Sequence, residues 1–226
     1  MNESDEFPKS FSVFKAHESQ RRLSRKLVTE DRVPRKINYV AGVDVAYSGN
    51  RAVGAVAVLD YPSLNLLEYQ TATCEAKFPY VPTLLSFREV PPSMACIRKL
   101  KLRPDVFLVD GHGMAHPLRC GFASHLGLAI NKPTIGVAKS SLIGGPVKIG
   151  NEVLIFDKGQ IVGSEVVTKK RSKSVYVSIG HMVSLKRAIK IVRHCAANSR
   201  IPKPLLLAHR IATEEKEKDG TEKNNR

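Results

Sequence analysis

Residues 38–75, NYVAGVDVAYSGNRAVGAVAVLDYPSLNLLEYQTATCE, contain three consecutive β-rich runs that decide the fold. The runs lie at 38–47, 52–60 and 65–75, and the links between them, SGNR and YPS, consist of turn-forming residues. Links this short join strands that run antiparallel to each other. The stretch therefore predicts a three-stranded antiparallel meander.

Beyond this meander, helices and strands are expected to alternate. The pattern predicts a helix over 83–101, a nearly all-apolar strand over 105–110, a helix over 118–130 and a strand over 133–138. A strand that follows a helical crossover pairs in parallel, with a right-handed connection. The order β-β-β-α-β-α-β is that of the ribonuclease H-like fold. We expect an α/β protein with one mixed sheet, in which parallel strands extend three antiparallel ones and helices flank the sheet.

The outer parts of the chain carry weaker signals. The further predicted elements are an N-terminal amphipathic helix at 10–28, strands at 152–156, 160–167 and 175–179, and helices at 184–196 and 204–212. The outer face of the first helix, with its arginines and lysine at 21–26, either contacts phosphates or is a solvated charged face. Residues 1–212 are predicted to form a single domain. Residues 213–226 have no apolar side chain, so they are predicted to be a charged, disordered tail.

The composition favours a polyanionic partner. The chain has 36 basic and 21 acidic residues, a formal net charge of +15, and 42% hydrophobic residues, enough for a sizeable core. Residues 1–210 hold 32 of the basic residues against 16 of the acidic ones, so the positive charge belongs to the predicted domain. Nucleic acid is the favoured partner, although basic chains also occur among ribosome-associated and simply soluble proteins.

The cysteines and the N-terminus indicate a soluble cytoplasmic protein. The four cysteines show neither CxxC spacing nor nearby histidines that would suggest zinc, and they are typical of reduced core residues. The start, MNESDEFPKSF, lacks an apolar signal core, and no uncharged apolar run approaches the roughly 18 residues that span a membrane. We expect a monomer with no membrane partner.

Three carboxylates indicate a metal site. Asp44 lies between two valines in the first predicted strand, where it is either an exposed polar residue or part of a cleft. Asp110 ends an apolar strand, at the edge where open α/β sheets bind ligands, and it neighbours Asp44 if the first strand lies beside the fourth. Two such carboxylates repel each other unless a cation lies between them. With Glu89 at the start of the next helix, the set favours Mg²⁺.

Four further features bear on a nucleic-acid substrate. Lys139, after the strand at 133–138, either neutralises charge at phosphorus or is a solvated loop lysine. Tyr80, held between prolines in FPYVP at 78–82, is either a wedge between bases or part of a packed turn. The glycines of DGHG at 110–113 suit a pocket for a flipped base, or an ordinary tight turn. The densest basic run is expected to contact the nucleic-acid backbone without sequence preference, and it consists of Lys169, Lys170, Arg171 and Lys173.

Over residues 10–210 the chain resembles the endonuclease V, or deoxyinosine 3′-endonuclease, family. The motifs that carry the resemblance are GVDVAY (42–47), FPYVPTLLSFRE (78–89), DVFLVDGHGMAHPLRCGFASHLGL (105–128), PTIGVAKS (133–140), VSIGHMVSL (177–185) and PLLLAH (204–209). The resemblance implies a DNA repair enzyme that depends on Mg²⁺, or on Mn²⁺ in its place. It implies that a metal-activated water hydrolyses the second phosphodiester bond 3′ to a deaminated base such as hypoxanthine. The products would carry 3′-hydroxyl and 5′-phosphate ends.

The resemblance also implies roles for single residues. Asp44, Glu89 and Asp110 would bind the metal, Lys139 would assist the attacking water, and His209 would be an additional ligand or would orient one. Tyr80 would fill the gap left by the everted base, and the residues expected around that base are Pro79, Pro82, Thr83, Leu85, Gly111, Gly113 and His116. The chain departs from the family pattern at two positions, where Thr83 replaces an expected glycine and Leu118 replaces an expected arginine.

Two alternative functions remain at this point. One is an endoribonuclease that cleaves single-stranded RNA at inosine, since no motif reports contacts to a 2′-hydroxyl group. The other is a noncatalytic nucleic-acid-binding protein, for which a broken carboxylate set would be expected. The carboxylate set here is intact, which favours an enzyme.

Overall fold

The computed structural model describes residues 12–224, with side chains up to residue 218. The first helix, α1, runs Val13–Ser24, and the Ser12 side chain caps its N-terminus by accepting a hydrogen bond from the Lys15 amide. The predicted helix at 10–28 is therefore present but shorter, and residues 10 and 11 lie outside the described residues. Asn38 and the loop before it lead from α1 into the sheet.

The predicted core of the sheet is confirmed. Strands β1 (Tyr39–Ser48), β2 (Arg51–Asp60) and β3 (Leu66–Glu75) form the antiparallel meander. Strand β4 (Val106–Asp110) pairs in parallel with β1, and β5 (Thr134–Ala138) pairs in parallel with β4. The first strand thus lies beside the fourth, as the element order required.

The second half of the chain extends the sheet with antiparallel strands. Strand β9 (Val175–His181) pairs with β5, and β8 (Gln160–Val166), β7 (Glu152–Asp157) and β6 (Gly145–Ile149) follow outward. The described residues form one nine-stranded sheet in the order β3-β2-β1-β4-β5-β9-β8-β7-β6. Strand β6 was not predicted. All five of its residues are exposed, so its sequence has no alternation of buried and exposed positions.

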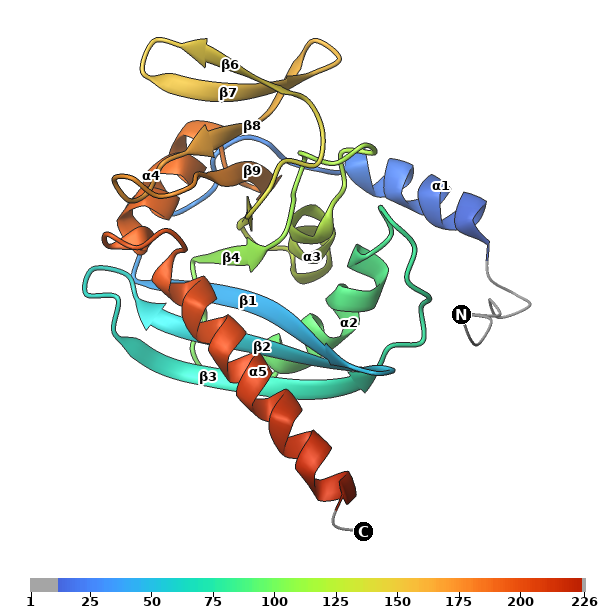
Figure 1. The fold of residues 1–226 in the computed structure, drawn as a ribbon. Coiled ribbons are helices and arrows are strands. Elements are labelled where there is room, and N and C mark those ends of the chain that lie inside the picture. Colours follow the sequence, from blue (N-terminus) through green and yellow to red (C-terminus); the bar gives the residue numbers. More distant parts are fainter. Residues whose placement is uncertain (1–11, 225–226) are drawn as a thin grey trace.

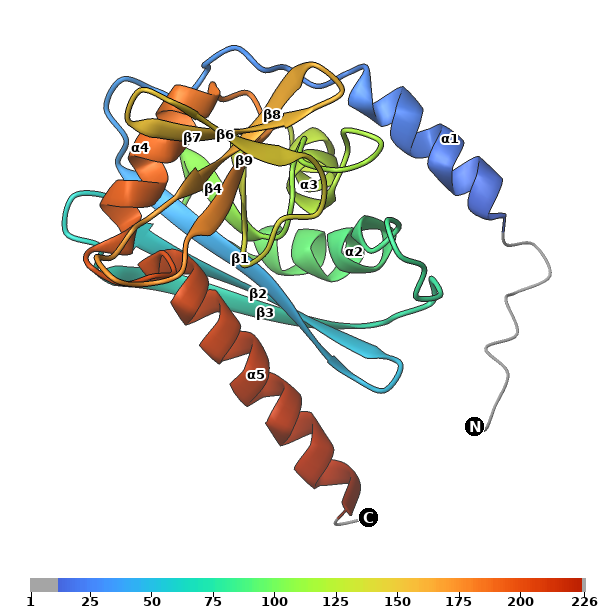
Figure 2. The ribbon, with the colours of Figure 1, turned by 45° about the horizontal axis from the view of Figure 1, so that its top comes forward.

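Helices cover both faces of the sheet (Figures 1 and 2). On one face α2 (Ser86–Ile97) and α3 (Phe122–Ile130) pack against one apolar cluster, and on the other face α4 (Leu185–Ala196) and α5 (Lys203–Asn224) pack against a second cluster. Helix α3 begins later than predicted because residues 118–120 belong to the loop that precedes it.

The last helix corrects the prediction for the C-terminal segment. Helix α5 runs Lys203–Asn224, well beyond the short helix predicted at 204–212. Residues 213–224, which the sequence predicted to be disordered, are helical in the structure. Figure 1 shows α5 crossing the β1–β3 face and continuing past the edge of the sheet. Among the described helices, none is both long enough and apolar enough to cross a membrane.

Two glycines allow these helices to approach the sheet closely. A Cβ atom at Gly42 would lie 2.1 Å from the Pro204 carbonyl oxygen of α5. A Cβ atom at Gly54 would lie 2.6 Å from the Pro92 carbonyl oxygen of α2. Any side chain at either position would push its helix away from the sheet. The close approach of α5 to β1 brings His209 against Asp44.

Candidate active site

Asp44 and Asp110 lie side by side where β1 and β4 reach the same edge of the sheet. The last parallel pair between these strands joins Val43 to Val109, one residue before each carboxylate. His209 Nδ1 lies 2.7 Å from Asp44 Oδ2. Asp44, Asp110 and His209 each offer one ligand atom, and these atoms lie within 4.8 Å of one another. Side chains from three elements far apart in sequence therefore converge on one point.

The electrostatics of this cluster are unfavourable without a cation. Burial raises the pKa of Asp44, the charge of Asp110 raises it further, and the hydrogen bond from His209 partly opposes both effects. Glu89, in the first turn of α2, is only 8% exposed, and burial together with the charges of Asp44 and Asp110 places its pKa well above the usual range. The negative charges of Asp44, Glu89 and Asp110 are therefore close enough to repel one another.

The donor set fits a divalent metal ion. Two carboxylates and an imidazole within 4.8 Å of one another are ligands that such ions accept, and a bound cation would remove the repulsion between the acids. Glu89 stands outside this group of three ligand atoms, although its pKa responds to the two aspartates. His209, which the sequence suggested only through the resemblance, lies directly against Asp44.

Lys139 follows β5 and points to the same cluster. Its Nζ atom lies 2.6 Å from Asp110 Oδ2, and half of the side chain is exposed. The carboxylate edge therefore has a cation on the solvent side. As the carboxyl end of β5 lies beside that of β4, the parallel order of the strands fixes this position.

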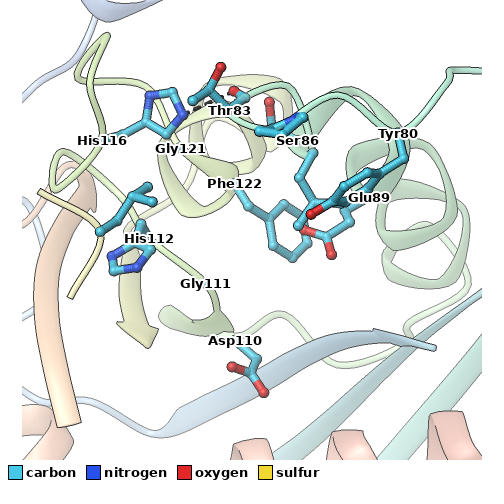
Figure 3. A pocket seen from close by; sticks show the side chains of 13 residues that line it. Tyr80, Thr83, Ser86, Glu89, Asp110, Gly111, His112, His116, Gly121 and Phe122 are labelled. Carbon is cyan, nitrogen blue, oxygen red and sulfur yellow. Dashed lines mark hydrogen bonds between the residues drawn. The ribbon is translucent and has the colours of Figure 1, made fainter. Parts of the chain in front are cut away.

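A cavity of about 260 Å³ opens beside the carboxylates (Figure 3). Glu89 and Asp110 form part of its wall, so the cavity and the metal-ligand candidates share residues. It is smaller than the roughly 300–1,000 Å³ typical of drug-sized ligand sites, and its lining is mainly apolar. The lining residues are Tyr80, Pro82, Thr83, Leu85, Ser86, Glu89, Asp110, Gly111, His112, His116, Gly121, Phe122 and Leu142.

Two of the residues predicted around the base do not line this cavity, namely Pro79 and Gly113. Gly113 has another role, because a Cβ atom there would lie 2.0 Å from the Ile179 carbonyl oxygen of β9. Its amide donates a hydrogen bond to Ser178 Oγ at 2.8 Å. The glycine therefore lets the loop after β4 pack against β9. The sequence pattern had not singled out Ser86, Gly121, Phe122 or Leu142 as lining residues.

Tyr80 stands at the mouth of the cavity. It is 65% exposed, whereas Phe78 in the same loop stacks on Phe87 of α2 with ring centroids 5.0 Å apart. His125 packs edge-on against Phe87 and lies 3.1 Å from Ser86 Oγ through its Nδ1 atom. Burial lowers the pKa of His125 to about 4, so it is a neutral, hydrogen-bonded helix residue. The loop is thus anchored at its base and presents the tyrosine to solvent.

The basic run forms a loop between β8 and β9, here called the basic loop and defined as residues 169–173. Arg200, which sequence reasoning missed, joins this loop to the site. Its guanidinium donates hydrogen bonds to the carbonyl oxygens of Lys139 at 3.0 Å, Lys173 at 3.1 Å and Ser174 at 3.1 Å. Contacts between segments this far apart in sequence produce no local pattern from which the role of Arg200 could be predicted. Arg200 therefore joins the C-terminal end of the basic loop to the backbone of Lys139.

Comparison with known proteins identifies the family of the chain. The family model described as Endonuclease V matches residues 21–210. Endonuclease V of Thermofilum pendens is 46% identical over 209 residues, covering 91% of this chain and 90% of that protein. Endonuclease V of Rippkaea orientalis is 43% identical over 208 residues, covering 89% of this chain and 90% of that protein.

Solved structures show the same fold. The endonuclease V of Streptomyces avermitilis superposes with a TM-score of 0.88 at 32% identity, covering 96% of this chain and 97% of that one. The Ciona intestinalis endonuclease V, in complex with a 24mer DNA containing an inosine followed by a ribo-adenosine, superposes with a TM-score of 0.83 at 34% identity, covering 91% and 98%. Because the family model covers residues 21–210, and the Thermofilum pendens and Rippkaea orientalis relatives are 46% and 43% identical over about nine tenths of each chain, this chain belongs to the endonuclease V family of nucleases.

Proposed function

We propose that this protein is a metal-dependent DNA repair endonuclease that recognises a deaminated base, hypoxanthine above all. It hydrolyses the second phosphodiester bond on the 3′ side of the lesion and leaves 3′-hydroxyl and 5′-phosphate ends. The observation that carries the proposal is that Asp110 and Glu89 belong both to the acidic cluster and to the wall of the cavity. A base held in that cavity keeps its own backbone beside the carboxylates.

Asp44, Asp110 and His209 would hold the metal, with Glu89 completing the acidic set. Mg²⁺ is the proposed ion because it prefers oxygen ligands and binds phosphate together with carboxylate, and Mn²⁺ would substitute for it. When bound, the ion supplies Lewis-acid stabilisation of phosphoryl oxygens and lowers the pKa of water. Two raised carboxyl pKa values in one small region support this assignment, because a divalent cation would offset both the burial and the mutual repulsion that raise them.

The remaining residues position and neutralise the substrate. Lys139 offers an ammonium group 2.6 Å from Asp110, where it would orient a water molecule or stabilise negative charge developing at phosphorus. The basic loop, attached to the Lys139 backbone through Arg200, would hold the strand by its phosphates. None of these contacts depends on base sequence, so recognition of the lesion is left to the cavity.

The cavity would hold the everted base, and Tyr80 would occupy the gap that it leaves. An exposed aromatic ring between two prolines is held at low entropic cost for stacking on the neighbouring bases. Thr83, Leu85, Gly111 and His116 line the space that the base would enter. Flipping is cheapest for a mispaired base, which favours deaminated bases over normal ones.

The test is cleavage of an end-labelled duplex with one deoxyinosine, analysed on a denaturing gel beside its undamaged twin. We expect one cut, one nucleotide beyond the lesion on its 3′ side, with Mg²⁺ and not with EDTA. Asp110→Asn should abolish the cut. Asp60→Asn, the same chemical change at the last residue of β2, should leave it intact. A cut that is insensitive to EDTA, or a fully active Asp110→Asn variant, would contradict the proposal.

An inosine-specific endoribonuclease is the second candidate. The observation that favours it is the Ciona intestinalis complex, whose DNA contains a ribo-adenosine directly after the inosine. Matched single-stranded substrates with either ribose or deoxyribose throughout separate the two functions, because only the 2′-hydroxyl groups differ. Faster cleavage of the deoxyribose strand and of duplex DNA supports the DNA repair function.

We place the enzyme in the cytoplasm, a proposal supported by its four free cysteines.

A further inference from the structure

Thr83 has an unusual backbone conformation in the wall of the cavity. Its φ angle is +73°, in the left-handed region that favours glycine and that β-branched residues rarely adopt. The glycine expected at this position from the family pattern would adopt this conformation without strain. Strained residues of this kind persist only where their surroundings hold them. Thr83 therefore needs contacts that fix its peptide.

Those contacts come from two separate parts of the chain. The Thr83 carbonyl oxygen accepts a hydrogen bond from Gln20 Nε2 at 2.9 Å, and His116 Nε2 lies 3.0 Å from the same oxygen. The Leu118 amide donates to the other His116 nitrogen, Nδ1, which leaves Nε2 as the protonated one. The Thr83 hydroxyl lies 3.1 Å from His17 Nε2.

Gln20 also contacts a second loop, the one that precedes α3. Its Nε2 atom donates a second hydrogen bond to the Cys120 carbonyl oxygen at 3.0 Å, just before Gly121 in the cavity wall. The residue is completely buried, and α1 has one other buried residue, Ala16. Figure 3 shows Thr83, His116 and Gly121 together on one side of the cavity, across from Asp110. One amide group thus joins the two loops that form this side.

We propose that Gln20 is a positioning residue for base recognition. Helix α1 acts as a strap that holds the Thr83 peptide and the Cys120 peptide at a fixed separation, and thereby sets the shape of the base pocket. Gln20 is absent from the lining of the cavity, so its effect passes through Thr83 and Gly121. The inference rests on the proposed function, because it concerns the pocket for the everted base.

The chemistry of the side chain explains why glutamine suits this position. Its neutral terminal NH₂ group offers two donors on one atom, and both are used on carbonyl oxygens. Methionine has the same length and no donor, so Gln20→Met removes both hydrogen bonds with little change in volume. Ser19→Ala is the matched control, because Ser19 lies next to Gln20 in the same helix and its hydroxyl donates to Lys15 within α1.

The experiment compares these variants on the deoxyinosine duplex and the undamaged duplex. For Gln20→Met we expect kcat/KM on the deoxyinosine duplex to fall about tenfold or more, since the Cys120 carbonyl group loses the Gln20 donor and the Thr83 carbonyl group keeps only His116. Affinity for the undamaged duplex in EDTA should stay within about twofold, because phosphate contacts govern it. Ser19→Ala should match the wild type. Equal losses on both duplexes, or wild-type activity in Gln20→Met, would overturn the proposal.

A rescue experiment separates positioning from a general structural role. In Gln20→Met/Thr83→Gly, glycine adopts the φ of +73° without strain, so part of the lost activity should return. Failure of this rescue would overturn the claim that Gln20 acts through Thr83. Should Gln20→Met fail to fold in thermal melts, His17→Ala tests the hold of α1 on Thr83, because His17 contacts the Thr83 hydroxyl. We expect kcat/KM of His17→Ala on the deoxyinosine duplex to fall about threefold. A wild-type protein with no preference for deoxyinosine would refute the proposed function itself, whereas a selective wild type with an equally selective Gln20→Met would refute only the strap.

Discussion

Replacing Asp44 with asparagine is expected to stabilise the metal-free protein while abolishing cleavage. Ligand atoms of Asp44 and Asp110 lie within 4.8 Å of each other, a separation at which Coulomb's law with an effective dielectric constant of about 20 gives roughly 3.5 kcal/mol of repulsion. His209 and Lys139 each lie against one of these carboxylates and offset part of that repulsion. We therefore expect the free energy of unfolding to rise by about 1–2 kcal/mol in EDTA, a gain typical of substitutions that relieve a strained functional site.

The pH dependence of this effect has a definite sign. Burial, with the charges of neighbouring carboxylates, raises the pKa values of Asp44 and Glu89 above those of the unfolded chain. Between the unfolded and folded pKa values, the folded protein binds more protons than the unfolded chain, so its stability falls as pH rises. Starting from about pH 4, where carboxyl groups in unfolded chains titrate, the wild type should lose stability more steeply than Asp44→Asn.

Urea unfolding from about pH 5 to 8, with EDTA or with Mg²⁺, measures both effects. An ion that binds only the folded state adds about 2.7 kcal/mol at a concentration of 100 times its Kd. Mg²⁺ should therefore stabilise the wild type strongly and Asp44→Asn much less, so that the order of stability reverses. Asp60→Asn should respond to Mg²⁺ as the wild type does, because its carboxylate lies outside the site. The reasoning is refuted if Asp44→Asn is no more stable than the wild type in EDTA, or if Mg²⁺ stabilises both alike.

Four further outcomes follow from single features of the site and fold. Tyr80→Ala should weaken binding to the deoxyinosine duplex by about 1–3 kcal/mol, the value of one stacked base, with no change for the undamaged duplex in fluorescence anisotropy. His209→Ala should raise the Mg²⁺ concentration for half-maximal cleavage by about 10–100-fold, as expected for loss of a group that orients a metal ligand; an unchanged metal titration would exclude His209 from the site. Alanine at the four basic positions of the basic loop should make the log of the DNA association constant fall less steeply with the log of salt concentration. The slope should decrease by up to about 0.9 for each phosphate that the loop no longer neutralises, and an unchanged slope would show that the loop does not contact DNA. Gly42→Ala should destabilise the fold by about 1–3 kcal/mol or more through overpacking against Pro204, measured as a lower urea midpoint.

The centre of the sheet was predictable from the sequence because short links and helical crossovers leave few topologies. Once β1 lies beside β4, Asp44 and Asp110 must be neighbours at one edge. Lys139 follows by the same rule, since β5 pairs in parallel with β4. The carboxylate edge and its lysine are thus consequences of local pattern and strand order, and they need no knowledge of distant contacts.

The extent of α5 could not be read from composition. Residues 213–218 lack apolar side chains, yet helix nucleation is the costly step, and the segment before them is already docked through buried Leu205 and Ala208. Propagation into a run of glutamates and lysines costs little because these residues are good helix formers. The ion pair of Arg210 with Glu214 at 3.6 Å spans the transition. A docked helix can therefore continue where an isolated segment of the same sequence would not fold.

Gln20 shows where local pattern fails for a physical reason. A glutamine among arginines on an amphipathic helix is typical of a solvent-facing residue, yet its two acceptors lie 63 and 100 positions away in sequence. The same contacts hold Thr83 in a conformation that its own β-branched side chain disfavours. At both Gln20 and Thr83, the conformation or burial that the local sequence favours differs from the one that the tertiary structure imposes. Such disagreement is expected where a protein sets the geometry of a functional site, because the pocket needs a shape that neither segment would adopt alone.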